Sequence, residues 1–495
     1  MVAKRRWAGI NHTIVPRLLL ALLLLSTVAA TATAADVVAA DARPNIVLVL
    51  TDDFATSDLA YLPSLRALTS ERGRTFRMIV PSPRCAPSRA SILTGQYAHN
   101  HGVLGNAPRT GGWEHLKPLE PELLPCWLRA AGYATHYSGK YINGYGRIPR
   151  HVPPCWNDWQ ALTKPHGDAR YAFAVNANGT VESHSGRYQT DVLAEKTAAF
   201  VAQAPEPFFA VFAPFAPHSP WRASDAYTGT MSGLEIRRAP SFNESDVSDK
   251  WQPPALLDAD AIAEIDARTR VRLEMMRSVE DGIAQIRAAL DARGIAGETY
   301  VFFTSDNGFM SGEHRIAVGK GVPYREATEV PLVVSGPGIT PGSVSQHLVA
   351  NHDLAPTFAA LAGVRVPASV DGRSIAELLT DDGTSGRRRV LLEHWSRTKG
   401  PLWKGLRTGR GVQIEWIGGP WESYDHGIDP YELSAGTDGD ADLLQRLATC
   451  AGRTCRRLER GRGIPPRATC RARTEVPLLG GGVGRACRAT QAMLP

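Results

Sequence analysis

Apolar residues fall into two kinds of run along the chain, and each kind predicts a different element. Short runs rich in β-branched and aromatic residues, followed by polar or Gly/Pro-rich residues, predict buried strands at 44–53, 207–221, 299–308 and 330–338. Apolar positions at helical spacing predict helices at 64–73, 189–203 and 267–294. Residues 124–141 predict a helix, a turn and a strand. This alternation is typical of an α/β sheet that binds ligands at the carboxyl ends of its strands.

The pattern changes after about Val390, where short strand-like pieces precede a predicted helix at 440–450. We interpret residues 44–390 as the main α/β domain and residues 391–456 as a smaller α+β C-terminal subdomain. Residues 457–495 are rich in Arg, Gly and Pro and lack periodicity, so we expect a disordered tail there.

Residues 1–35 predict a targeting signal. Lys4, Arg5 and Arg6 precede a run of apolar residues and then a small-residue stretch, as in a secretory signal peptide. The run is short for a membrane span, with an uncleaved anchor as the alternative, and no later segment approaches a span. We therefore expect a secreted or extracytoplasmic protein without a stable membrane span.

The net charge says little about partners once its distribution is considered. The formal net charge is +6, but residues 1–35 contribute four cationic side chains, and residues 456–495 contribute nine arginines against two glutamates. About −5 is left for residues 36–455, so the body is mildly acidic and we expect no nucleic-acid partner.

The seven cysteines are an odd number for an exported chain. Six cysteines allow fifteen connectivities, and position suggests Cys450 with Cys455, Cys126 with Cys155, and Cys470 with Cys487. The cysteine left over is Cys85, in the run RCAPSRASILTG. A thiol beside two guanidinium groups could be a nucleophile of lowered pKa, half of a disulfide, or a residue that is modified.

Oxygen-bearing side chains follow two predicted strands: Asp52 and Asp53 end the first, and Asp306 and Asn307 end the strand at 299–308. Such a set suits a hard cation such as Ca²⁺ or Mg²⁺, although each pair alone is more typical of a helix cap or an Asx-turn. Cationic side chains that could surround an anionic tetrahedral group on the metal are Arg89, Lys140, His218 and Lys320. Taken singly, each of these is more typical of a solvated surface charge.

The run Cys85-Ala86-Pro87-Ser88-Arg89, followed by Leu93-Thr94-Gly95, resembles the C-x-P-S-R-x-x-x-L-T-G signature of the sulfatase family. The resemblance extends from Pro44 to about Arg456 and includes VLTDD, TSDNG, GEHRIAVGK and EVPLVVSGPG. GKYINGYG, RAPSFNESDVSDK and APHSP are most similar to the branch of N-acetylglucosamine-6-sulfatases and related bacterial arylsulfatase-like enzymes. The resemblance implies an alkaline-phosphatase-like mixed sheet flanked by helices.

The resemblance also implies the chemistry. In this family the motif cysteine is oxidised to Cα-formylglycine by a formylglycine-generating enzyme, which would make Cys85 an aldehyde whose hydrate is the nucleophile. The implied activity is hydrolysis of a sulfate ester on a sulfated sugar, such as a glucosamine 6-sulfate, or of an aryl sulfate. One Ca²⁺ per chain is implied, with the ligands Asp52, Asp53, Asp306, Asn307 and the modified residue at position 85.

Roles for the cationic residues follow by position in the same way. Arg89 would hold the hydrate, while Lys140, His218 and Lys320 would bind the sulfate oxygens. His218 would also protonate the leaving alcohol.

Several positions bear on the substrate pocket. Many arylsulfatases have a histidine two residues after the lysine matched by Lys140, where this chain has Ile142; Asn143 is the candidate for a substrate hydrogen bond instead. Phe54 stands where a polar residue is common. His99 and His314 are further candidates for substrate contacts, with ordinary loop histidines as the alternative.

Two other functions use the same residues. A site with this geometry and charge pattern could hydrolyse a phosphodiester or a phosphonate monoester. If Cys85 stays a thiol, the ion and the cations would make a non-catalytic binder of sulfated glycans.

Overall fold

A computed structural model describes residues 43–163, 170–381, 383, 386–396 and 400–461. The predicted signal peptide, Cys470, Cys487 and the predicted tail beyond residue 461 lie outside these residues. The described residues from Pro44 to Gly461 form one compact unit. No helix in the described ranges combines the length and the apolar composition that a bilayer crossing requires.

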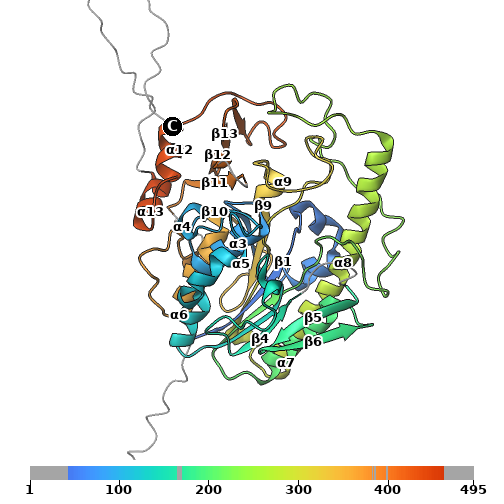
Figure 1. The fold of residues 1–495 in the computed structure, drawn as a ribbon, viewed down its shortest axis with the longest axis vertical. Coiled ribbons are helices and arrows are strands. Elements are labelled where there is room, and N and C mark those ends of the chain that lie inside the picture. Colours follow the sequence, from blue (N-terminus) through green and yellow to red (C-terminus); the bar gives the residue numbers. More distant parts are fainter. Residues whose placement is uncertain (1–42, 164–169, 382, 384–385, 397–399, 462–495) are drawn as a thin grey trace, which may run out of the picture. The chain divides into compact units, whose positions relative to one another are not determined.

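A ten-stranded mixed sheet organises this unit, in the order β10-β2-β9-β8-β1-β7-β3-β4-β5-β6 (Figure 1). Its centre consists of four parallel neighbours: β8 (Thr299–Ser305), β1 (Asn45–Thr51), β7 (Phe208–Ala213) and β3 (Ala134–Gly139). The register of β1 and β8 runs from Asn45 opposite Thr299 to Thr51 opposite Ser305, so the two strands end side by side. These central strands confirm the runs predicted from the sequence.

The outer strands complete the sheet. β9 (Glu329–Ser335) is antiparallel to β8, and β2 (Arg74–Ile79) is antiparallel to β9, so β2 runs in the direction of the central four. β10 (Val344–Ala350) and β4 (Asp158–Leu162) extend the sheet in parallel, and the far margin is a hairpin of β5 (Ala172–Ala177) and β6 (Thr180–Ser185).

A separate antiparallel sheet follows, consisting of β11 (Arg389–Trp395), β12 (Pro401–Thr408), β13 (Gly411–Trp416) and β14 (Trp421–Asp425). It confirms the predicted change to short strands near Val390.

The helices and 3-10 turns are η1 (Thr56–Tyr61), α2 (Pro63–Leu68), α3 (Cys85–Thr94), α4 (Ala98–His101), α5 (Trp113–Leu116), η2 (Lys117–Glu122), α6 (Leu124–Ala130), η3 (Tyr145–Arg147), α7 (Gln189–Gln203), α8 (Ala259–Ala292), η4 (Ala296–Glu298), α9 (Arg325–Thr328), η5 (Asn351–Asp353), α10 (Leu354–Leu361), α11 (Ala376–Thr380), α12 (Ala441–Leu447) and α13 (Arg453–Arg460).

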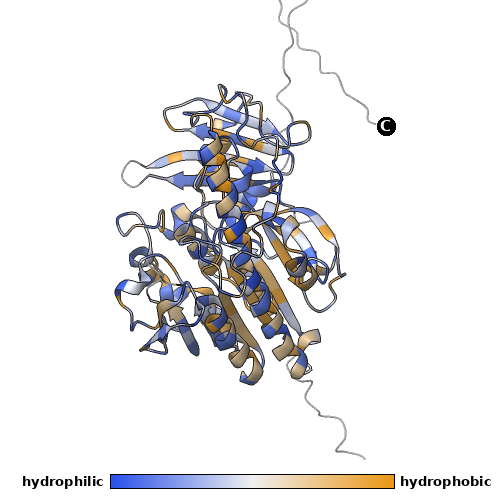
Figure 2. Cartoon of the chain, turned by 90° about the vertical axis from the view of Figure 1, so that its right-hand side faces the viewer, coloured by the Kyte–Doolittle hydropathy of each residue, from blue (hydrophilic) through white to orange (hydrophobic). Residues whose placement is uncertain are grey.

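Helices cover both faces of the large sheet, because successive strand residues point to opposite sides. Ile46, Leu48 and Leu50 of β1 belong to one buried core with residues of α3, α6 and α10, whereas Val47 and Val49 belong to a second core with residues of α7 and α8. The hydrophobic colouring of the central strands in Figure 2 follows from this burial on both sides. The fold is therefore the layered α/β sheet expected from the sequence.

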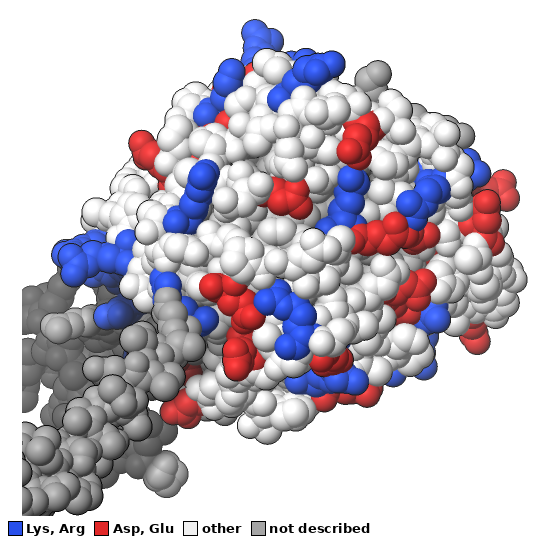
Figure 3. Space-filling view, turned by 90° about the horizontal axis from the view of Figure 1, so that it is seen from below, with Lys and Arg blue, Asp and Glu red and all other residues white. Residues whose placement is uncertain are grey.

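Surface charge is mixed in sign on the face shown in Figure 3. There, basic and acidic side chains are interspersed over the described part of the molecule.

The longest helix, α8, begins eight residues before the predicted start at 267. The side chain of Asp258 caps it by accepting a hydrogen bond from the amide of Ala261 (2.9 Å), so the helix starts at an N-cap and not at the first strongly apolar position.

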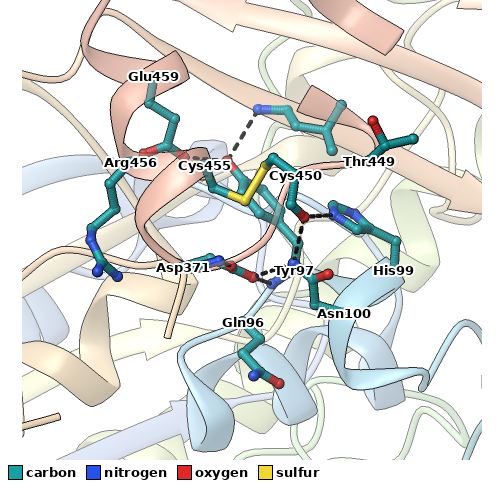
Figure 4. The surroundings of a disulfide bond; sticks show 12 residues. Gln96, Tyr97, His99, Asn100, Asp371, Thr449, Cys450, Cys455, Arg456 and Glu459 are labelled. Carbon is teal, nitrogen blue, oxygen red and sulfur yellow. Dashed lines mark hydrogen bonds between the residues drawn. A yellow bond between two sulfur atoms is a disulfide. The ribbon is translucent and has the colours of Figure 1, made fainter. Parts of the chain in front are cut away.

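Two predicted disulfides are confirmed, Cys126–Cys155 and Cys450–Cys455, and Cys85 is the free cysteine among the described residues. The Cys450–Cys455 bond links the end of α12 to α13 beside α4 (Figure 4).

The predicted start of the tail at residue 457 is wrong, because α13 continues to Arg460. Glu459 of this helix is fully buried, pairs with Arg387 (3.1 Å) and Arg373 (3.2 Å), and accepts a hydrogen bond from the Tyr97 hydroxyl. The sequence of α13 looks like a solvated basic segment, but this buried carboxylate, the Cys450–Cys455 disulfide and a hydrogen bond from Arg456 to the carbonyl of Val370 attach it to the rest of the unit.

Removing this carboxylate tests the attachment. We expect Glu459→Ala to lower the free energy of unfolding by about 3 kcal/mol, because Arg387 and Arg373 would stay buried without this partner. The exposed pair Asp442–Arg446 of α12 supplies the control, since Asp442→Ala should change stability by about 0.5 kcal/mol or less. Urea unfolding followed by circular dichroism measures both; equal midpoints for the two variants would contradict the attachment.

Candidate active site

The predicted site residues come together at one edge of the large sheet. Asp52 follows β1, Asp306 follows β8, Lys140 follows β3, and His218 lies in the segment after β7. Cys85 begins α3, the helix that follows β2. These five strands run in one direction, so their carboxyl ends lie at the same edge of the sheet. The site residues therefore come from five separate segments of the chain.

Three carboxylates form the centre of the site. Asp52, Asp53 and Asp306 are buried, and each offers an oxygen within 4.8 Å of the others. The amide of Asp53 donates to Asp306 Oδ1 (3.3 Å), and Asn307 Nδ2 donates to Asp53 Oδ1 (2.6 Å). Asp53 has φ +67°, a conformation that is uncommon for a residue with a side chain and is concentrated at functional sites.

This cluster fits a hard divalent cation. All of its donor atoms are oxygens, and the Oδ1 atom of Asn307 is buried without a hydrogen-bond partner among the described residues. Burial, followed by the charge of Asp52, raises the pKa of Asp306 to about 6. A cation among these oxygens would relieve that repulsion and would give the Asn307 carbonyl a partner.

Cationic side chains surround the carboxylates. Arg89 Nε donates to Asp306 Oδ2 (2.8 Å), the Lys140 ammonium contacts Asp52, and the Lys320 ammonium contacts Asp53. Burial opposes ionisation of Asp52, but Lys140, His218 and Arg89 outweigh it and hold its pKa well below the usual value. Burial likewise disfavours a charged Lys320, but the carboxylate of Asp53 outweighs it and raises the lysine pKa.

The Cys85 thiol lies within this charged set and is fully buried. Its Sγ is 2.8 Å from Lys320 Nζ and 3.5 Å from Asp52 Oδ1. Burial, and then the charge of Asp52, raise the pKa of the thiol to about 11. The raised pKa argues against a nucleophile of lowered pKa, and Cys85 has no disulfide partner among the described residues, so the modified residue is the interpretation that the structure favours.

His218 faces the carboxylates from the loop after β7. Its Nε2 is 3.7 Å from Asp53 Oδ2, and its Nδ1 contacts the carbonyl of Ser219 (2.5 Å), which orients the ring. The imidazole ring of His218 stacks on the ring of Phe215, and the Lys140 ammonium lies 4.7 Å from the centre of the Phe215 ring. Burial lowers the pKa of His218.

Two predicted substrate contacts have partners within the protein and stay predictions. His99 uses both ring nitrogens within the protein, Nδ1 with Glu393 (3.1 Å) and Nε2 with the carbonyl of Cys450 (3.0 Å; Figure 4). His314 is 1% exposed, and its Nδ1 bonds Glu244 (2.9 Å) at the base of the loop that carries Lys320. These histidines hold distant segments together. Asn143 is half-buried with an unpartnered Oδ1 and stays a predicted substrate contact.

Supporting residues were missed by sequence reasoning. Ser88 donates to the carbonyl of Asp306, and Asn351 Nδ2 donates to the Ser88 hydroxyl (2.8 Å). The motif serine therefore fastens α3 to the end of β8. Asn351 comes from η5, which no local sequence signal connects with the site.

Known proteins share this arrangement of segments. Residues 44–364 match the family model described as Sulfatase, and residues 312–447 match the model described as N-sulphoglucosamine sulphohydrolase, C-terminal. Human N-acetylglucosamine-6-sulfatase is 36% identical over 379 residues, which are 72% of this chain and 68% of the relative.

Solved structures share the fold. The structure of BT4656 in complex with its substrate D-glucosamine-2-N,6-O-disulfate has a TM-score of 0.68 at 22% identity, covering 81% of this chain and 95% of that chain. The phosphonate monoester hydrolase of Agrobacterium radiobacter has a TM-score of 0.63 at 21% identity, covering 81% and 93%. At these identities the likeness concerns the fold alone.

The oxygen cluster predicts cation binding that can be measured directly. We expect Asp306→Asn to weaken Ca²⁺ binding at least about tenfold, equivalent to about 1.4 kcal/mol, because one anionic ligand is lost. Calorimetric titration of the purified protein gives the affinity, with Asp442→Asn on the surface of α12 as the control. Unchanged affinity in Asp306→Asn would remove this carboxylate from the ligand set.

The His99–Glu393 pair gives stability a pH dependence. Burial opposes the charged ring, but Glu393 outweighs it and raises the His99 pKa from 6.5 to about 9. A raised pKa stabilises the fold fully below pH 6.5, and this contribution is lost as the pH rises through 9. We expect His99→Gln to remove about 2–3 kcal/mol at pH 6 and far less at pH 9.5. Urea midpoints across this range measure the effect; parallel profiles for both proteins would contradict it.

Proposed function

The chain belongs to the sulfatase family of sulfuric ester hydrolases, and we propose that it removes sulfate from a sulfated sugar, with a glucosamine 6-sulfate as the model substrate. The convergence of Cys85, three carboxylates and the ammonium groups of Lys140 and Lys320 at one sheet edge carries this proposal. The sugar is suggested by two names, that of the human relative and that of the BT4656 substrate. An aryl sulfate would be accepted as a simpler substrate of the same bond type.

We propose that Cys85 is converted to Cα-formylglycine by a formylglycine-generating enzyme. A thiol whose pKa is about 11 is a poor nucleophile at neutral pH, and the residue has no disulfide partner. The hydrated aldehyde would supply one hydroxyl that attacks sulfur and a second whose deprotonation releases the sulfate.

The carboxylates of Asp52, Asp53 and Asp306, the Asn307 carbonyl and residue 85 would hold one Ca²⁺. The ion would supply positive charge that polarises a bound sulfate oxygen. It would also neutralise the carboxylates that Lys140 and Lys320 now contact, so that the two ammonium groups could face an anionic substrate.

The cationic residues would then act directly on the ester. Lys140 and Lys320 would bind sulfate oxygens and stabilise the charge that develops on them. Arg89, fixed by Asp306 and by the carbonyl of Lys140 (2.6 Å), would hold residue 85 in place. His218, which faces the same cluster with Nε2, would give a proton to the leaving alcohol.

We propose that the protein works outside the cytoplasm. The N-terminal segment resembles a secretory signal, and two disulfides within the described residues are typical of an oxidising compartment.

A second candidate activity is hydrolysis of a phosphonate monoester or a phosphodiester. It is favoured by the fold shared with the phosphonate monoester hydrolase and by a charge pattern that suits either tetrahedral anion. Comparing kcat/KM for an aryl sulfate and an aryl phosphonate separates the two activities, and faster turnover of the phosphorus ester would reverse our order of preference.

The residue at position 85 decides between an enzyme and a non-catalytic binder. We expect the peptide that contains it to be lighter than the thiol form by about 18 Da, the difference between the two side chains. We expect Cys85→Ala to lower turnover by about 10⁴-fold or more while the protein stays folded, because the nucleophile is lost. Mass spectrometry and an aryl sulfate assay test both statements. If the residue 85 peptide of active protein has the full mass of the thiol form, the proposed mechanism is wrong.

A further inference from the structure

Arg84 is a half-buried cation without a partner. It precedes Cys85, yet its side chain makes no hydrogen bond or ion pair within the described residues, and its Nε is buried and unpartnered. Arg89, five positions later, has Asp306, the carbonyl of Lys140 and Asp52 as partners. A partly desolvated guanidinium that lacks an acceptor is unfavourable in the free protein and is typical of a position that meets a ligand.

His394, at the end of β11, is a second polar group without a partner. It is 4% exposed, and its Nδ1 is buried with no hydrogen-bond partner in the described structure. The preceding residue, Glu393, bonds His99, so its carboxylate is already engaged by another residue. Burial, and then the charge of Arg84, lower the pKa of His394 to about 3, so the ring is neutral and offers one N–H donor.

Arg84 and His394 converge on Gly321. A Cβ atom built at Gly321 would lie 2.8 Å from Arg84 Nε and 3.2 Å from His394 Nε2, so the two side chains face the same point from different segments. Gly321 has φ +85°, and its carbonyl accepts a hydrogen bond from Trp403 Nε1 (3.0 Å). The backbone there is therefore held by the C-terminal sheet.

This point adjoins, along the chain, two residues of the candidate site. Gly321 follows Lys320, whose ammonium is 2.8 Å from the Cys85 sulfur, and Arg84 precedes Cys85 in the chain. Arg84 and Gly321 are thus the chain neighbours of Cys85 and Lys320, and His394 lies near the end of β11 in the C-terminal sheet.

We propose that Arg84 and His394 form a second anion subsite, which binds a sulfate or carboxylate group on the substrate other than the sulfate that is cleaved. The inference rests on the proposed function and specifies its substrate class: sugars with a second negative charge near the scissile ester. The guanidinium can bind such a group with two parallel hydrogen bonds. His394 adds a third donor in the tautomer that carries its proton on Nε2, the nitrogen that faces the same point as Arg84. Arg84 contacts none of the carboxylates of the oxygen cluster, so its role is selectivity and not bond cleavage.

Matched substrates test the subsite. Three forms of glucosamine 6-sulfate would be compared as substrates. The first carries an N-acetyl group, the second carries an N-sulfate group, and the third carries an N-acetyl group and is linked to a neighbouring uronic acid. We expect Arg84→Gln to lower kcat/KM about 30-fold for the substrate whose second charge the subsite reads, mainly through KM, in line with a lost hydrogen bond to a charged group. For the N-acetyl substrate, which lacks that second charge, kcat/KM should change less than about threefold. The N-sulfate and uronic acid arms show which anion is bound.

Two more variants make the test decisive. His394→Gln should shift selectivity in the same direction, and it replaces Arg84→Gln if that variant does not fold. Arg293→Gln, at a surface pair with Glu206, is the control and should leave selectivity unchanged. The mass of the residue 85 peptide in each variant corrects rates for incomplete modification. An equal loss on all substrates, or no loss, would overturn the subsite.

Failure of the proposed function looks different. If fully modified wild-type protein hydrolyses none of these esters, the proposed function fails. The subsite is then tested by calorimetric binding of the N,6-O-disulfate to wild type and to Arg84→Gln. The 6-sulfate with the neighbouring uronic acid is titrated in the same way, and equal affinities of the two proteins for both ligands would overturn the subsite independently.

Discussion

Mutual neutralisation of buried charges at one sheet edge is the constraint on which this structure depends. Three carboxylates and three cations, Arg89, Lys140 and Lys320, share a volume with almost no access to water. Neither set could be buried without the other, because an unpaired charge in such a place costs several kcal/mol. Any ligand that enters must therefore exchange partners with charges already present, which suits a divalent cation entering together with an anionic ester.

The topology of the sheet makes this arrangement possible. β1 and β8 end in register, and β7 and β3 continue the parallel run on the other side of β1. One or two polar residues follow the apolar residues of each strand where it leaves the core. The charged edge therefore begins directly after the apolar interior. The reversed strand β9 restores β2 to the common direction, which brings the start of α3 to the same edge.

Sequence patterns revealed the central strands and the strand-end residues because both depend on local properties. Strands buried on both faces are continuous apolar runs, and polar pairs directly after them stand out. β2, β4, β5, β6, β10 and β14 were not identified. Of these, β6 and β10 are partly exposed and carry many polar residues, which hides them from a search for apolar runs. The internal partners of His99 and His314 could not be predicted, because Glu393 and Glu244 lie 294 and 70 residues away in the chain. The thiol of Cys85 looked activated by its neighbouring arginines, but burial beside Asp52 reverses that effect.

The complete burial of the signature segment also bears on the order of events in biosynthesis. Every residue from Cys85 to Thr94 is buried, and Lys320, more than two hundred residues later in the chain, covers the sulfur. An enzyme that modifies Cys85 needs access to its side chain, and the folded protein buries that side chain completely. The oxidation that we propose for Cys85 would therefore have to precede closure of the C-terminal half over it, and folded protein that still carried the thiol would not be converted later.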